Sequence, residues 1–144
     1  MRVGDCSVLF VDDEIDFLET LLKRMRKRQV EVFGVESGEK ALVFLERTSV
    51  DVVVLDVKMP GMDGIQTLRE IKARYPMIEV IMLTGHASME AAIEGMELGA
   101  FDYLMKPMHI DELLYKLEDA CKRKEIQETK IALMNEKAPA PDER

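Results

Sequence analysis

Acidic side chains follow apolar segments at two places in the sequence, and a lysine follows a third. Asp12 and Asp13 come directly after VLFV, Asp56 comes after VVVL, and Lys106 comes after DYLM. Carboxylates that lie close together repel one another and hold protons more tightly. A hard divalent cation removes this repulsion, and Mg²⁺ prefers one or two carboxylates together with water and phosphate oxygens. If these residues meet, they predict a Mg²⁺ site, which Mn²⁺ could also fill.

A lysine and a hydroxyl group would add a second function to such a site. Lys106 could neutralise an incoming anion, and Thr84, at the end of EVIMLT, could donate a hydrogen bond to one of its oxygens. Carboxylates, a metal ion and a lysine are typical of phosphoryl transfer, where positioning and charge neutralisation provide most of the catalysis. A carboxylate nucleophile would form an acyl phosphate. We expect Asp56 to be that nucleophile, because it ends a central strand and the Asp12–Asp13 pair is better placed to hold the ion.

The elements that must position these residues alternate along the chain. Short apolar segments bounded by turn or polar residues predict strands at 7–11, 30–35, 51–55, 79–83 and 101–105. The longer segments between them place apolar residues on one helical face, with Ser37 and Asp63 as expected N-caps. This alternation predicts an α/β fold with a doubly wound, five-stranded parallel sheet. Sites in such sheets form beyond the carboxyl ends of the strands, so the acidic residues, Thr84 and Lys106 should share one edge.

Composition limits the classes of protein to which the chain could belong. The 144 residues predict one domain, residues 1–124 with a core at 6–124, followed by a helical extension and a disordered tail or linker at 125–144. The net charge of -8 argues against direct binding to nucleic acid or to an anionic membrane. We interpret the basic stretch KRMRKR at 23–28 first as a solvated helix end and second as a docking surface for a partner. No apolar run approaches the ~20 residues that span a bilayer.

The cysteines and the N-terminus point to a location. Cys6 and Cys121 share no metal-binding or redox spacing, and MRVGDCSVLFVDDE lacks the apolar core of a signal peptide. We therefore expect free thiols in a reducing cytoplasm.

A family resemblance rests on four segments of the sequence. FVDDE, LDVKMPGMDG, LTGHAS and FDYLMKP resemble, in order and spacing, the signatures of response-regulator receiver domains of two-component signal transduction, the CheY-like superfamily. The resemblance covers roughly residues 6–124. It implies a flavodoxin-like fold with strand order 2-1-3-4-5.

The resemblance also implies roles for the acidic residues. Asp56 matches the phosphorylated aspartate, Asp13 the direct Mg²⁺ ligand, and Asp12 a ligand that acts largely through water. Lys58 matches the position whose backbone carbonyl completes the metal shell. Lys58 is also expected, together with His86, to set the lifetime of the phosphorylated state by controlling the access of water.

Further roles concern the response to phosphorylation. Thr84 and Lys106 match the pair that contacts the phosphoryl group, and Tyr103 matches an aromatic switch that turns inward when Thr84 moves. Tyr103 also fits an ordinary half-buried strand residue. The Lys106–Pro107 bond matches a peptide that is often cis in this family, and proline lowers the free-energy cost of that isomer.

These roles describe a signalling switch. A histidine kinase or phosphotransfer protein would phosphorylate Asp56 in the presence of Mg²⁺, and the face built by the fourth helix, the fifth strand and the fifth helix would change. That face would act on a downstream output domain or protein, or form a homodimer. The chain would catalyse only its own phosphorylation and slow dephosphorylation, and would not be an enzyme acting on a free metabolite.

Other readings of the sequence remain open. LTGHAS and FDYLMKP resemble receivers joined to nitrogen-regulation activators, so the chain could be a fragment of a larger DNA-binding regulator or a stand-alone receiver. An aspartyl-phosphate phosphatase is less favoured, because such enzymes commonly carry a second aspartate where this chain has Lys58. In a flavodoxin, VDDE would repel the flavin phosphate. Residues 125–136 should extend the fifth helix and could pair between subunits.

Overall fold

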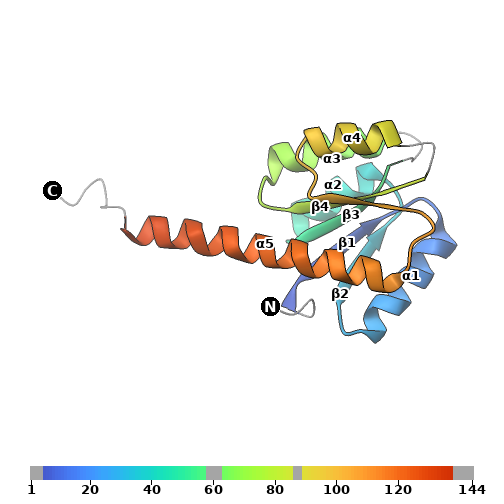
Figure 1. Ribbon diagram of the computed structural model, residues 1–144, viewed down its shortest axis with the longest axis horizontal. Helices are drawn as coiled ribbons and strands as arrows, with labels where there is room; N and C mark the ends of the chain where they lie inside the picture. Colours follow the sequence, from blue (N-terminus) through green and yellow to red (C-terminus); the bar gives the residue numbers. More distant parts are fainter. Residues whose placement is uncertain (1–4, 58–62, 86–88, 138–144) are drawn as a thin grey trace.

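The computed structural model describes residues 5–57, 63–85 and 89–137. Five strands alternate with five helices in this part of the chain (Figure 1). The strands are β1 (Ser7–Val11), β2 (Glu31–Val35), β3 (Val52–Asp56), β4 (Glu79–Thr84) and β5 (Asp102–Met105). The helices are α1 (Ile15–Lys27), α2 (Gly38–Arg47), α3 (Gly64–Arg74), α4 (Met89–Glu97) and α5 (Ile110–Lys137). The predicted strands are confirmed to within one residue at each end.

The strands form one parallel sheet in the order β2-β1-β3-β4-β5. Val11 is in register with Leu55 on the neighbouring strand β3, and Asp56 with Leu83 on β4. The predicted doubly wound fold and strand order are therefore confirmed. Strands β3 and β4 are buried along their whole length, as expected for central strands covered by helices on both faces.

Helices cover both faces of the sheet and enclose a core on each side (Figure 1). On one face, α1 and α5 pack against Phe10, Val54 and Leu83. On the other, α2 and α3 pack against Leu9 and Leu55. Alternate residues of each strand thus serve opposite cores. The central strands are therefore packed from both sides, and Asp56 at the end of β3 is positioned by this packing.

Local signals set the ends of two helices. The Ser37 side chain accepts a hydrogen bond from the N–H of Lys40, and Asp63 and Gln66 form a reciprocal capping box at the start of α3. Both predicted N-caps are confirmed. The Lys106–Pro107 peptide bond is cis.

The cysteines contradict the sequence-based expectation. Cys6 and Cys121 are joined by a disulfide, although 115 residues separate them in the sequence. The prediction of free thiols is therefore wrong: it rested on sequence spacing, whereas the fold brings α5 against the start of β1.

Helix α5 continues beyond the sheet. It contains 28 residues, and its C-terminal part projects away from the other elements (Figure 1). No helix among the described residues is both long and apolar enough to cross a membrane.

Candidate functional site

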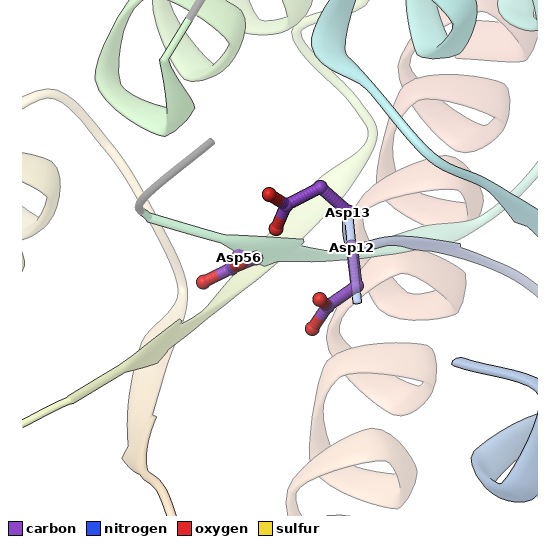
Figure 2. Close-up of side chains that lie close together, drawn as sticks. All are labelled: Asp12, Asp13 and Asp56. Atoms are coloured by element: carbon purple, nitrogen blue, oxygen red, sulfur yellow. The ribbon is translucent and has the colours of Figure 1, made fainter. Parts of the chain in front are cut away.

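Three carboxylates meet at the carboxyl edge of the sheet. Asp12 and Asp13 follow β1, and Asp56 is the last residue of the neighbouring strand β3 (Figure 2). One carboxylate oxygen from each lies within 4.8 Å of the others. Asp12 and Asp56 are buried, whereas Asp13 is more accessible to solvent. The parallel pairing of β1 with β3 brings together residues that lie more than forty positions apart.

Lys106 supplies a positive charge to this cluster. Its Nζ lies 3.0 Å from a carboxylate oxygen of Asp12, 3.0 Å from one of Glu14 and 3.8 Å from one of Asp56. The backbone N–H of Lys106 donates to the carbonyl of Thr84, which ties the start of this loop to β4. Its ammonium group also lies 4.6 Å from the centre of the Phe17 ring, at cation–π distance.

The charges of the cluster alter its proton affinities. Burial raises the pKa of Asp12 by more than the Glu14 N–H and the Lys106 ammonium group lower it. Burial alone would lower the pKa of Lys106, but hydrogen bonds to Asp12 and Glu14 outweigh this effect and raise it. Lys106 therefore stays charged at neutral pH. The charged form of Asp12 is costly at this buried position, so a nearby cation is favourable.

The donor set fits a hard divalent cation. Grouped carboxylate oxygens, two of them from buried residues, are the ligands that Mg²⁺ prefers, and Mn²⁺ accepts the same donors. Asp12, Asp13 and Asp56 would hold the ion. Such an ion would neutralise the negative charge that accumulates during phosphoryl transfer.

Thr84 lies one strand beyond Asp56, at the end of β4. It is fully buried, and its hydroxyl donates only a weak contact of 3.5 Å to the sulfur of Met105. Tyr103 lies on the adjacent strand β5, is partly buried, and packs against the core formed with α2 and α3. Among the sequence-predicted residues, Lys58 and His86 lie outside the described part of the chain.

Sequence reasoning missed two contacts of the site and one steric constraint. Glu14 and Phe17, in and beside the first turn of α1, contact Lys106, and only the proximity of Glu14 to the aspartate pair hinted at this. At Gly64, a Cβ atom would stand 2.6 Å from the backbone oxygen of Asp56. A glycine is required there because the start of α3 crosses directly against the end of β3.

Comparison with known proteins identifies the class. The profile of the response regulator receiver domain family matches residues 8–118. The chain therefore belongs to this family, and it is a receiver domain of the type found in two-component response regulators.

Relatives include full-length transcriptional regulators. The chain is 42% identical over 120 residues to the transcriptional regulatory protein ZraR of Escherichia coli (strain K12), a match that covers 83% of this chain and 27% of ZraR. It is 38% identical over 113 residues to the DNA-binding transcriptional regulator NtrC of Salmonella typhimurium, covering 78% of this chain and 24% of NtrC. The chain thus spans about a quarter of the length of these curated relatives.

Solved structures agree with this assignment. A response regulator receiver domain from Clostridium thermocellum superposes with a TM-score of 0.82 at 35% identity, covering 85% of this chain and 98% of that one. NtrX from Brucella abortus superposes with a TM-score of 0.84 at 27% identity, covering 92% of this chain and 30% of NtrX.

Proposed function

We propose that the chain is a phosphoacceptor switch, in which Asp56 receives a phosphoryl group from a histidine kinase or phosphotransfer protein when Mg²⁺ is present. The observation that carries this proposal is the grouping of Asp12, Asp13 and Asp56 within 4.8 Å beside the Lys106 ammonium group. It provides a nucleophile, the ligands for a divalent cation and a fixed positive charge in one place.

The chain's own groups support a role for Asp56 as nucleophile. Asp56 ends a central strand and is only 6% exposed, so its carboxylate is held in place and largely shielded from competing water. A carboxylate oxygen attacks phosphorus, and the bond between phosphorus and the donor's leaving atom breaks. Lys106, already 3.8 Å from Asp56, then neutralises part of the charge on the acyl phosphate.

Thr84 and Lys106 would convert this chemistry into a change of shape. Both residues are next to β5. Lys106 follows the strand in the chain, and the Thr84 hydroxyl makes a weak contact with Met105, the last residue of the strand. A phosphoryl group offers that hydroxyl a much stronger acceptor. Movement of Thr84 toward the phosphoryl group would leave space for the Tyr103 side chain to turn inward. This change would shift the equilibrium between two conformations of the α4-β5-α5 face. Lys58 and His86 are proposed to set the lifetime of the phosphorylated state.

The proposed output face carries apolar groups suited to a partner. Ile93 and Met96 on α4 are 56% and 39% exposed. Either a downstream output domain or a second copy of the chain could cover them, with the latter giving the proposed homodimer through α4-β5-α5. No direct contact with nucleic acid by this domain is proposed.

A hollow beside the site fits the phosphoryl donor. It has a volume of about 160 Å³, lies between α1 and the start of α5, and is lined by Phe17, Thr20, Leu21, Arg24, Met108 and Ile110. Phe17 contacts Lys106, so a protein docked there would reach the acidic cluster. The apolar lining suits a helix of a kinase or phosphotransfer protein.

The chain is further proposed to be the receiver part of a larger DNA-binding transcriptional regulator that works in the cytoplasm. The support is its match to about a quarter of ZraR and NtrC.

The decisive experiment is intact mass spectrometry after incubation with Mg²⁺ and a phosphoryl donor. One arm uses acetyl phosphate, and the other uses a phosphorylated histidine phosphotransfer protein. Asp56→Ala and a metal-free sample are the negative controls, and Asp16→Asn is a matched control for an exposed carboxylate outside the cluster. We expect one added phosphoryl group in the wild type and in Asp16→Asn, and none in the negative controls. No gain from either donor would overturn the proposal.

A further inference from the structure

The disulfide between Cys6 and Cys121 lies at the opposite end of the sheet from the acidic cluster. Cys6 precedes β1, whereas Asp12 follows it, and a strand of five residues is about 17 Å long. Cys121 lies within α5, and both residues are 1% exposed. The bond thus joins the helix of the proposed output face to the first strand, away from the phosphorylation chemistry.

The same position accommodates either redox state of the pair. The Cα atoms are 6.1 Å apart, within the ordinary range for a disulfide, so the same backbone can hold either the bond or two thiols at rest. Both residues belong to the apolar core between the sheet and the α1 and α5 helices. A buried thiol behaves there as a small apolar side chain, so reduction leaves no polar group unsatisfied.

Two ion pairs close to Cys121 attach α5 to the sheet independently of the disulfide. Lys124 Nζ lies 2.8 Å from a carboxylate oxygen of Asp51, which precedes β3. Arg123 Nε lies 3.3 Å from a carboxylate oxygen of Glu79, at the start of β4. Both cations are within one helical turn of Cys121. The bond is therefore an additional attachment of a helix that is already docked, and its loss should loosen α5 without unfolding the domain.

We propose that Cys6 and Cys121 form a reversible oxidation site that changes how firmly α5 is attached to the sheet. Disulfides rarely persist in a reducing cytoplasm, and those that form there are usually transient or redox-sensing. The inference uses only the cytoplasmic setting from the proposed function, and it does not depend on phosphorylation of Asp56.

The oxidant is a low-molecular-weight disulfide such as oxidised glutathione. One cysteine thiolate attacks it, a mixed disulfide forms and one small thiol leaves. The second cysteine thiolate attacks the mixed disulfide, the protein disulfide forms and a second small thiol leaves. Overall, the two cysteines lose two electrons and two protons, and the small disulfide gains them. Because both sulfurs are buried, each exchange requires α5 to move briefly away from β1.

The test compares the full chain after treatment with oxidised glutathione and with dithiothreitol, both under native conditions. We expect intact masses that differ by two hydrogen atoms, full interconversion, and a thermal midpoint roughly 5–10 °C higher for the oxidised chain. Hydrogen exchange in α5 should be faster in the reduced chain, while Mg²⁺ affinity should be the same in both. Cys6→Ala and Cys121→Ala should each remove the dependence of the midpoint on redox state.

A second measurement tests the route of access. In the reduced, folded chain, Lys124→Met should speed alkylation of the cysteines about tenfold, because it removes the ion pair that opposes opening of α5. Lys122→Met, an exposed lysine two residues away, should leave the rate unchanged. The proposal is overturned if the bond reduces only when the chain is unfolded, if native oxidation stops at a mixed disulfide, or if the two thiols never join.

Discussion

The ammonium group of Lys106 lies 3.0 Å from a carboxylate oxygen of Asp12 and 3.8 Å from one of Asp56, so one side chain contacts two of the three acidic residues. In this arrangement the lysine partly neutralises the carboxylates. A divalent cation held by the same oxygens would lie close to it, and two cations near one another repel. Lysine and metal ion are therefore expected to oppose one another before a phosphoryl group arrives, and to share the added negative charge afterwards.

Replacement of Lys106 should separate metal binding from phosphoryl transfer. Lys106→Met removes the competing positive charge, so we expect Mg²⁺ to bind roughly five- to tenfold more tightly, which corresponds to about 1 kcal/mol of binding free energy. Phosphorylation of Asp56 should fall sharply, because the charge that stabilises the acyl phosphate is lost. Calorimetric titration with Mg²⁺ measures the first effect and intact mass the second. Lys116→Met, which breaks the pair with Asp102, is the control. Weaker Mg²⁺ binding in Lys106→Met would contradict the prediction.

Asp12 should reduce stability at neutral pH. Burial raises the pKa of Asp12 in the folded chain, so protonation of this carboxyl favours folding. The stabilisation is fully present below the unfolded pKa of about 3.9 and is lost as the pH rises through the folded pKa. Asp12→Asn mimics the protonated form. In metal-free buffer, it should raise the free energy of unfolding at neutral pH by about 1 kcal/mol, a typical size for one substitution.

Urea denaturation at several pH values checks this prediction. The advantage of Asp12→Asn should shrink toward zero below about pH 4, where the wild-type carboxyl is protonated. Asp16→Asn, at an exposed position in the first turn of α1, should show no such pH-dependent gain. An advantage that persists unchanged into acid would point to a cause other than ionisation.

Thr84 should transmit the effect of phosphorylation without being needed for the chemistry itself. Thr84→Val keeps the shape of the side chain and loses only a weak contact with Met105, so the loss of stability should stay below about 1 kcal/mol. Intact mass should still show a phosphoryl group on Asp56. We expect the amide resonance of Tyr103 to shift on phosphorylation of the wild type and to remain close to its unphosphorylated position in Thr84→Val. A full wild-type shift in the variant would remove Thr84 from the switch.

Asp51, which precedes β3 at the end of the sheet opposite the acidic cluster, should stabilise the domain without affecting that cluster. Burial alone would raise its pKa, but hydrogen bonds from Lys124 and Ser7 outweigh this and lower it. Its contribution is therefore present above the unfolded pKa and lost as the pH falls through the folded value. Asp51→Asn should cost roughly 1–3 kcal/mol at neutral pH, since it leaves Lys124 with a weaker partner.

The matched control is the exposed pair of Glu36 and Lys40, where Glu36→Gln should change stability by less than about 0.5 kcal/mol. Phosphorylation of Asp51→Asn should be normal, because the substitution lies at the far end of β3. A cost as small as that of Glu36→Gln would show that the Asp51–Lys124 pair contributes little.

The end of α5 should affect association rather than folding. Ile126, Ile131, Leu133 and Met134 are each about half exposed or more. Removal of residues 126–144 should leave the thermal midpoint within about 2 °C, because few buried contacts are lost. Any self-association seen by sedimentation velocity should weaken. Unchanged sedimentation across a wide concentration range would exclude pairing through this segment.

The sequence predicted the features that follow from local periodicity. Short apolar runs predict the strands, and the rule that parallel strands share a carboxyl edge predicts that Asp12, Asp13, Asp56 and Lys106 lie together. The contacts of Lys106 with Glu14 and Phe17 depend on the direction in which α1 leaves β1, which periodicity does not determine. The prediction of free thiols at Cys6 and Cys121 fails for a related reason: proximity across 115 residues is a property of packing rather than of spacing.

The length of α5 has a mechanical consequence. From Lys124, where ion pairs hold the helix to the sheet, about 20 Å of helix extends to Lys137. A stiff rod anchored at one end amplifies small rotations, so a tilt of about 5° at the anchor would carry the far end through nearly 2 Å. Small rotations of α5 where it meets the sheet would in this way become larger displacements at its far end. The ion pairs of Lys124 are then the point about which α5 rotates, and their strength determines how far the end of the helix moves.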